Sequence, residues 1–196
     1  MARPTKDQIK ALPLFNGLER CDIKLVENEH DAKQAIKALQ HETCIGFDTE
    51  SKPTFKKGEQ SAGPTLIQLS TMSQAFLFPT QFPAAINAAG IILSNPEIKK
   101  VGFGLKNDKS ELLKFGIKVK NTEDLATTLK VFFKEKQRIG ARAAVAMLLN
   151  TRLSKSAQQS NWAAYPLEAH QIKYAANDAY AALCCEHALL NINVIN

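Results

Sequence analysis

Four carboxylates and one tyrosine have types and spacings suited to binding a metal ion: Asp48, Glu50, Asp108, Tyr174 and Asp178. Asp48 and Glu50 are two apart at the end of an apolar run, and alternate residues of a strand face the same side. Tyr174 and Asp178 are four apart in an alanine-rich segment, where a helix would place them on one face. Carboxylates that converge in a cleft repel one another unless a cation compensates them. Because Mg²⁺ and Mn²⁺ prefer oxygen ligands, the pattern predicts a divalent metal site.

The elements that must position these residues alternate between strands and helices. Apolar runs and alternation predict strands at 22–26, 44–50, 65–70, 74–78 and 99–104. The third and fourth of these strands are separated by a short turn, and the second, third and fourth should form an antiparallel meander. Helical spacing predicts helices at 31–39, from after 79 to about 93, and at 107–116, 124–133, 141–149 and 166 to about 190. Pro166 would lie in the first turn of the last helix, and 51–63 reads as a loop.

Each of the five residues also has a simpler interpretation when it is taken alone. Asp108 begins a helix, where an acid suits the positive end of the helix dipole. Two acids at the end of a strand commonly do no more than face solvent at the edge of a sheet. An aromatic residue on a helix usually belongs to the core. The prediction of a metal site therefore depends on the whole set and on the elements that carry it.

The 196 residues suit a single domain of ordinary size. We expect a partly flexible N-terminal arm at 1–20 and one domain at 21–196. The composition, 45% hydrophobic and 22% charged, is typical of a soluble globular protein. No apolar stretch has the length of a signal core or a membrane span, so we expect a cytoplasmic protein, nuclear in a eukaryote, without a membrane partner. Four cysteines without a C-x-x-C pair predict reduced thiols. The oligomeric state stays open.

The excess positive charge of the chain lies in one stretch. Between residues 97 and 138 there are eleven Lys or Arg and six Asp or Glu, a surplus of five out of the net charge of +6. A bound metal would neutralise acids and leave a more positive surface, which favours a nucleic-acid partner. The alternative is that these lysines only solvate helix faces.

Together and in this order, three segments resemble the exonuclease motifs of the DEDD superfamily: 46–50, 101–108 and 174–179. The histidine variant of that superfamily carries His five residues before its last aspartate, where this chain has Lys173. The tyrosine variant (DEDDy) instead matches Tyr174. Within this subclass, residues 22–190 most resemble the exonuclease domain of the Werner syndrome protein, with ribonuclease D more distant. Supporting matches lie at 65–69, 118–121 and 160–167.

The resemblance implies a ribonuclease H-like α/β fold, in which helices flank a mixed sheet. It also implies hydrolysis of phosphodiester bonds from a 3′ end, which releases nucleoside 5′-monophosphates with the help of two divalent ions, Mg²⁺ or Mn²⁺. Because of their positions in the matched motifs, Asp48, Glu50 and Asp178 would hold the first ion, and Asp48 would bridge to the second. Asp108 would act at the second ion. Tyr174 would orient the attacking water or help to deprotonate it.

The sequence suggests further substrate contacts, each weighed against a packing role. Candidates to wedge against the terminal base or ribose are Thr49, Phe103 and Leu105. Candidates for a phosphate track are Lys52, Lys56, Lys57, Lys106 and Lys109. Asn107 would bond a substrate backbone group. Trp162 would either stack on a base or pack in the core.

Three functions are consistent with these observations. A 3′-5′ exonuclease acting on DNA leads, because the Werner-like matches exceed those to ribonuclease D. An exoribonuclease is the alternative enzyme, since a preference between the two polymers would depend on contacts to the 2′-hydroxyl that one sequence does not reveal. A catalytically silent nucleic-acid-binding domain is the third, but such a domain has no need of four mutually repelling carboxylates.

Overall fold

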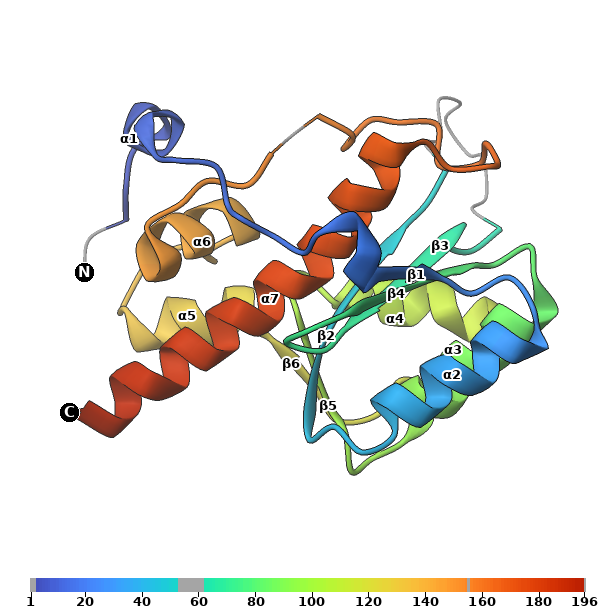
Figure 1. The fold of residues 1–196 in the computed structure, drawn as a ribbon. Helices are drawn as coiled ribbons and strands as arrows, with labels where there is room; N and C mark the ends of the chain where they lie inside the picture. Colours follow the sequence, from blue (N-terminus) through green and yellow to red (C-terminus); the bar gives the residue numbers. More distant parts are fainter. Residues whose placement is uncertain (1–2, 53–61, 155, 196) are drawn as a thin grey trace.

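Within residues 3–52, 62–154 and 156–195, which the computed structural model describes, six strands form one mixed sheet (Figure 1). They are β1 (Ile23–Leu25), β2 (Cys44–Glu50), β3 (Leu66–Ser70), β4 (Ala75–Pro79), β5 (Lys99–Gly102) and β6 (Thr122–Asp124). Their order across the sheet is β1-β4-β3-β2-β5-β6. Strands β2, β3 and β4 form the predicted antiparallel meander, and β1, β5 and β6 add to it in parallel.

Helices cover both faces of this sheet (Figure 1). The helices are α1 (Lys6–Ala11), α2 (Glu29–Leu39), α3 (Pro83–Ser94), α4 (Lys106–Leu112), α5 (Leu125–Phe132), α6 (Ala141–Leu149) and α7 (Ala169–Ile195). Helices α2 and α3 pack together on one face, and the long helix α7 crosses the other over β2 and β3. Helices α5 and α6 lie beside α7 and share a second core with it. Four of the predicted active residues therefore come from two elements that pack together, Asp48 and Glu50 from β2 and Tyr174 and Asp178 from α7.

The alternation of β2 explains how this interface is built. Ile45 and Phe47 are completely buried in the core beneath α2 and α3. The intervening Gly46 faces α7, since a Cβ atom at this position would lie 1.9 Å from the carbonyl oxygen of Ala179. Only glycine allows the helix to approach the strand so closely. Asp48, two residues further on, therefore projects from the same face toward α7.

The last helix begins later than the sequence predicts. Helix α7 starts at Ala169, so the prediction that Pro166 lies in its first turn is wrong. The peptide bond between Tyr165 and Pro166 is cis. The backbone N–H of Glu168 donates to Oε1 of Gln171 at 2.9 Å, so a side chain within the first turn satisfies a donor at the helix start. The helix also continues to Ile195 rather than ending near 190.

Two short elements were not predicted, α1 and β6. Strand β6 has only three residues, and its pairing with β5 defines it. Helix α1 has six residues and a capping box, in which the Thr5 hydroxyl accepts from the Gln8 N–H while the Gln8 side chain accepts from the Thr5 N–H. The predicted end of the helix after Asp108 is confirmed, because Gly116 follows the 3₁₀ turn Leu113–Phe115 in the left-handed region at φ 73°.

The segment that connects α1 to β1 runs along α6 and α7 (Figure 1). The N–H of Phe15 donates to the carbonyl of Arg152 at 2.9 Å, and the ring of Phe15 lies 5.9 Å from that of Tyr180. The N–H of Leu18 donates to Oδ1 of Asn177 at 3.0 Å. The predicted arm at 1–20 thus contacts α7 directly beside Asp178. Its flexibility and the domain boundary at 21 stay predictions.

The prediction of reduced thiols agrees with the structure. Cys21, Cys44, Cys184 and Cys185 are all free. Burial, the largest cause, raises the pKa of Cys44 to about 11, so this thiol stays protonated at neutral pH. Among the helices of the described ranges, none combines the length and the apolar character that crossing a bilayer requires.

Candidate metal centre

The structure brings three of the predicted acids together at the carboxyl end of β2. Asp48 and Glu50 come from this strand and Asp178 from α7, and each offers a carboxylate oxygen within 4.8 Å of the others. Their convergence follows from local geometry, because the strand places two acids on one face and α7 crosses that face. All three side chains are partly buried.

The fourth acid, Asp108, reaches this region from the first turn of α4. Its Oδ1 accepts a hydrogen bond of 2.5 Å from the hydroxyl of Thr49, the residue between the two acids of β2. Burial raises the pKa of Asp108, although the bond from Thr49 acts against this shift. The negative charge of Asp108 in turn contributes to the raised pKa values of Asp48 and Glu50. Asp108 is therefore electrostatically coupled to the acids of β2.

Burial raises the pKa values of the three central carboxyl groups, and repulsion by neighbouring acids raises those of Asp48 and Glu50 further. Burial raises the pKa of Asp48 well above its usual value, and the charge of Asp178 is the next largest cause. Burial, followed by the charge of Asp178, raises the pKa of Glu50 to about 8. Burial also raises the pKa of Asp178 to about 6, against the hydrogen bond from Tyr174. Without a cation this cluster would retain protons at neutral pH, and a bound divalent cation would ionise it.

The donor set fits a hard divalent cation. Every candidate ligand atom is a carboxylate oxygen, which Mg²⁺ and Mn²⁺ prefer over nitrogen or sulfur. Several negative charges in a partly buried site are stable only when positive charge compensates them. The residues that would hold the cation are Asp48, Glu50 and Asp178, with Asp108 beside them.

Tyr174 lies one helical turn before Asp178 and is hydrogen-bonded to it. Burial is the largest cause that raises the pKa of Tyr174, and the charge of Asp178 adds to it. The group is therefore a neutral phenol at neutral pH and a hydrogen-bond donor. A phenol in this position can orient a water molecule but is a poor base.

Arg142 of α6 is a positive group near the site that the sequence analysis did not single out. Its charge acts to lower the pKa of Asp178, after the effects of burial and of Tyr174. The Nη2 atom of Arg142 donates to Oε1 of Gln158 at 3.1 Å. No local pattern in the sequence connects residue 142 to residue 178, because their proximity depends on the packing of α6 against α7.

Two of the predicted substrate contacts are buried side chains. Leu105 is 2% exposed and belongs to the core beneath α2 and α3. Trp162 is 3% exposed, and its ring lies 6.0 Å from that of Tyr174. Both positions favour the packing alternative that the sequence analysis considered. A cavity of about 130 Å³ nevertheless opens beside Trp162, with Leu66 and Tyr165 among its walls.

The other predicted contacts are more accessible. Phe103 is partly buried against the core shared by α5, α6 and α7. Lys106 and Asn107 are exposed at the start of α4, next to Asp108. Lys52 and Lys109 are also exposed. The remaining members of the predicted phosphate track, Lys56 and Lys57, lie outside the residues that the structure describes.

Comparison with known structures defines the class of this fold. The EXO domain of Nibbler from Aedes aegypti superposes with a TM-score of 0.78, at 24% identity, over 91% of this chain and 92% of that domain. Ribonuclease D from Trypanosoma brucei, in a complex with RNA U12, superposes with a TM-score of 0.77, at 21% identity, over 94% of this chain and 64% of the other. The predicted ribonuclease H-like α/β fold is therefore confirmed.

Comparison of sequences then defines the family. Residues 23–192 match the 3′-5′ exonuclease family, and the chain belongs to it. The mouse bifunctional 3′-5′ exonuclease/ATP-dependent helicase WRN is 31% identical over 155 residues, which are 76% of this chain and 11% of the mouse protein. This chain thus spans about a tenth of the length of that relative. Members of the family are nucleases that use divalent metals, which confirms the predicted enzyme class and the kind of cofactor.

Proposed function

We propose that this protein is a 3′-5′ exonuclease of the tyrosine variant of the DEDD superfamily, which removes nucleoside 5′-monophosphates from DNA. The observation that carries the proposal is the convergence of Asp48, Glu50 and Asp178 beside the hydrogen-bonded Tyr174. Membership of the 3′-5′ exonuclease family supports the reaction. The tyrosine variant is supported by Lys173, which is exposed and takes the place of the histidine of the other subclass.

In this proposal the acids bind the cofactor and the tyrosine positions water. Asp48, Glu50 and Asp178 would hold one divalent ion, Asp48 would be shared with a second, and Asp108 would contribute to the second. Such ions, when bound, acidify water and neutralise charge on the phosphate. The Tyr174 phenol, fixed by its bond to Asp178, would hold the attacking water in line with the phosphorus atom. The positive charge of Arg142 would help to attract the phosphodiester.

DNA is the proposed substrate, and RNA is the alternative. The resemblance to the Werner exonuclease domain, particularly at 160–167, agrees with the 31% identity to the mouse exonuclease/helicase and favours DNA. The likeness to a ribonuclease D that was solved with RNA favours the alternative, although at 21% identity it reflects the fold alone. Exposed Lys106 and Asn107 beside Asp108, and the basic stretch 97–138, would suit the backbone of either polymer.

A direct nuclease assay tests the proposal. Oligonucleotides of DNA and of RNA with a 5′ label, single-stranded or with a recessed 3′ end, would be incubated with Mg²⁺, Mn²⁺ or a chelator. We expect a ladder of products shortened from the 3′ end on DNA, faster than on RNA, and no products with the chelator. Faster degradation of RNA would support the exoribonuclease instead. If the folded protein degrades neither polymer with either metal, the proposal that it is a nuclease is wrong.

A further inference from the structure

The side chain of Gln68 lies in an unusual position on β3. It is completely buried, and within the described part of the chain neither Oε1 nor Nε2 has a hydrogen-bond partner. Residue 68 pairs directly with Asp48 in the antiparallel register of β2 and β3. Because directly paired residues of antiparallel strands project from the same face, the carboxamide lies beside the Asp48 side chain, under α7.

Apart from Ser70, two residues further along β3, the neighbours of Gln68 on this face are apolar. Its partner on the other side, in the register of β3 with β4, is Leu77, which is completely buried. Leu66, two residues before it on β3, belongs to the same buried cluster as Leu77. Ala175 and Ala176 of α7 belong to that cluster as well. Asp48 therefore carries the carboxyl group that the strand register places directly opposite the carboxamide.

A buried amide without partners destabilises a fold, and buried polar groups are almost always hydrogen-bonded. The side chains of directly paired residues start from Cβ atoms about 5 Å apart, a distance that a glutamine can span to reach a carboxylate. The oxygens of a carboxylate are strong hydrogen-bond acceptors. The Nε2 group of Gln68 is the donor that the strand register places opposite those of Asp48.

We propose that Gln68 is a positioning residue, whose buried carboxamide donates to Asp48 and holds this carboxylate in its metal-binding orientation. The inference rests on the proposed function, since it takes Asp48 as a metal ligand. Groups that hydrogen-bond to metal ligands commonly change metal affinity or activity by about 10-fold to 100-fold. Gln68 would act on the substrate only through Asp48.

Ser70 provides a matched control on the same strand. It is completely buried, and its Oγ likewise lacks a hydrogen-bond partner among the described residues. It projects from the same face, two residues beyond Gln68, but its partner in the register is Gly46, which offers no carboxylate. Replacement of Ser70 therefore removes a comparable buried polar group without affecting the metal ligands.

The experiment is a titration with Mn²⁺ in the presence of a nucleoside 5′-monophosphate, followed by isothermal calorimetry. The proteins are the full chain, Gln68→Met, Gln68→Leu, Ser70→Ala and Asp48→Asn. Methionine keeps nearly the length and volume of glutamine, so Gln68→Met should fold as stably as the original, which a thermal melt without metal would check. We expect the dissociation constant for Mn²⁺ to rise about 10-fold in both Gln68 variants. It should stay within about twofold of the original in Ser70→Ala.

The possible results separate this inference from the proposed function. If Gln68→Met and Gln68→Leu bind Mn²⁺ as tightly as the original chain, the positioning role is wrong and the metal site stands. If Ser70→Ala weakens binding as much as they do, the effect is one of general packing and the positioning role is again wrong. If the original chain and Asp48→Asn bind Mn²⁺ equally, Asp48 is not a ligand, and both proposals fail.

Discussion

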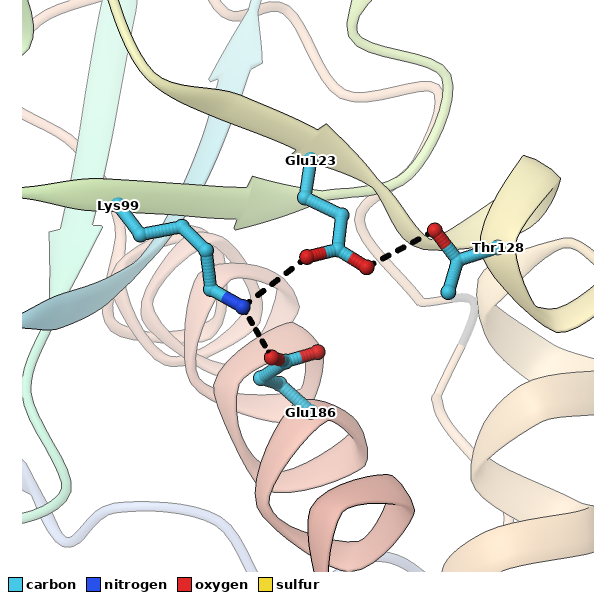
Figure 2. A network of polar contacts seen from close by, with 4 residues as sticks. All are labelled: Lys99, Glu123, Thr128 and Glu186. Atoms are coloured by element: carbon cyan, nitrogen blue, oxygen red, sulfur yellow. Dashed lines mark hydrogen bonds and ion pairs between the residues drawn. The ribbon is translucent and has the colours of Figure 1, made fainter. Parts of the chain in front are cut away.

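Partly or fully buried acids lie near both ends of the interface between β2 and α7, and their charges are compensated differently at the two ends. Near the amino end of β2, Lys99 lies between Glu123 and Glu186 (Figure 2). Its Nζ donates to Oε2 of Glu123 at 3.0 Å and to Oε1 of Glu186. Oε1 of Glu123 also accepts from the hydroxyl of Thr128 at 2.9 Å. Burial opposes the charge of Lys99, but the bonds to both acids outweigh it and raise the pKa of the lysine.

At the carboxyl end of β2 the acids have no such partner. Among the described residues no ion pair to Asp48, Glu50 or Asp178 is found, and their pKa values are raised. Asp178 and Glu186 are on the same helix, about 12 Å apart along its axis. At one end of the interface a lysine of the chain thus pairs with the acids, whereas the other end requires a cation from solution. This difference distinguishes a structural ion pair from a binding site.

The largest effect, on the nuclease rate, should follow from removing an acid of the candidate metal site at the carboxyl end of β2. We expect Asp48→Asn to lower the nuclease rate about 1,000-fold, because metal ions contribute several kcal/mol to transition-state stabilisation. Without metal, the variant should be at least as stable as the original chain, since it has lost one of several repelling groups. Single-turnover assays and urea unfolding would measure the two effects. An unchanged rate would remove Asp48 from the site.

At the opposite end of the interface, loss of the Lys99 side chain should destabilise the fold. We expect Lys99→Met to lower the free energy of unfolding by about 3 kcal/mol, because it leaves Glu186, whose side chain is 3% exposed, without its partner. Urea unfolding would measure this change. Lys10→Met is the control, since the Lys10–Asp7 pair is exposed and should contribute nothing measurable. Equal stabilities of the two variants would show that the buried pair is unimportant.

A smaller effect should come from the water-positioning group. We expect Tyr174→Phe to lower the single-turnover rate about 30-fold, corresponding to about 2 kcal/mol for a hydrogen bond to a charged group. The dissociation constant for the oligonucleotide should stay nearly unchanged, because the ring is retained. Fluorescence anisotropy with Ca²⁺ in place of Mg²⁺ would measure binding without turnover. A variant that kept the full rate would contradict the assigned role.

An effect of similar size should appear in the pH dependence of stability without metal. The folded chain retains protons that the unfolded chain has released, because the pKa of Glu50 rises from 4.5 to about 8 and that of Asp178 from 3.8 to about 6. Stability contributed by these groups is present at low pH and is lost as pH rises through this window. After solvent screening, we expect a loss of about 2 kcal/mol between pH 5 and 7.5.

Urea unfolding in EDTA and in Mg²⁺ would test this dependence. Saturating Mg²⁺ should abolish the loss, since a cation compensates the ionised acids. Glu50→Gln should reduce it in EDTA, because this variant lacks one of the titrating groups. Lys100, whose pKa burial lowers to about 8, acts in the opposite direction above this range. A stability that rises with pH in EDTA would contradict the comparison of the two ends.

Elements with a strong local signal could be predicted from the sequence. Strand β2 spans Cys44–Glu50 as expected, because an apolar run ends there in acids. Helix α6 likewise spans the expected Ala141–Leu149. The predictions failed where tertiary contacts override local preference. Strand β6 consists of three residues that are extended because β5 pairs with them. Pro166 lies outside α7 although proline commonly begins a helix.

The sequence by itself determined the types and local spacings of the acids, and hence the kind of site. Two residues on a strand or four on a helix share a face whatever the remaining fold, so Asp48 with Glu50, and Tyr174 with Asp178, were evident as pairs. Only the tertiary structure decided which pairs meet and what surrounds them. The neighbourhood of Gln68 depends on strand register, and the compensation of one acidic end but not the other depends on how α7 docks on the sheet. Such long-range contacts leave no periodic pattern in the chain.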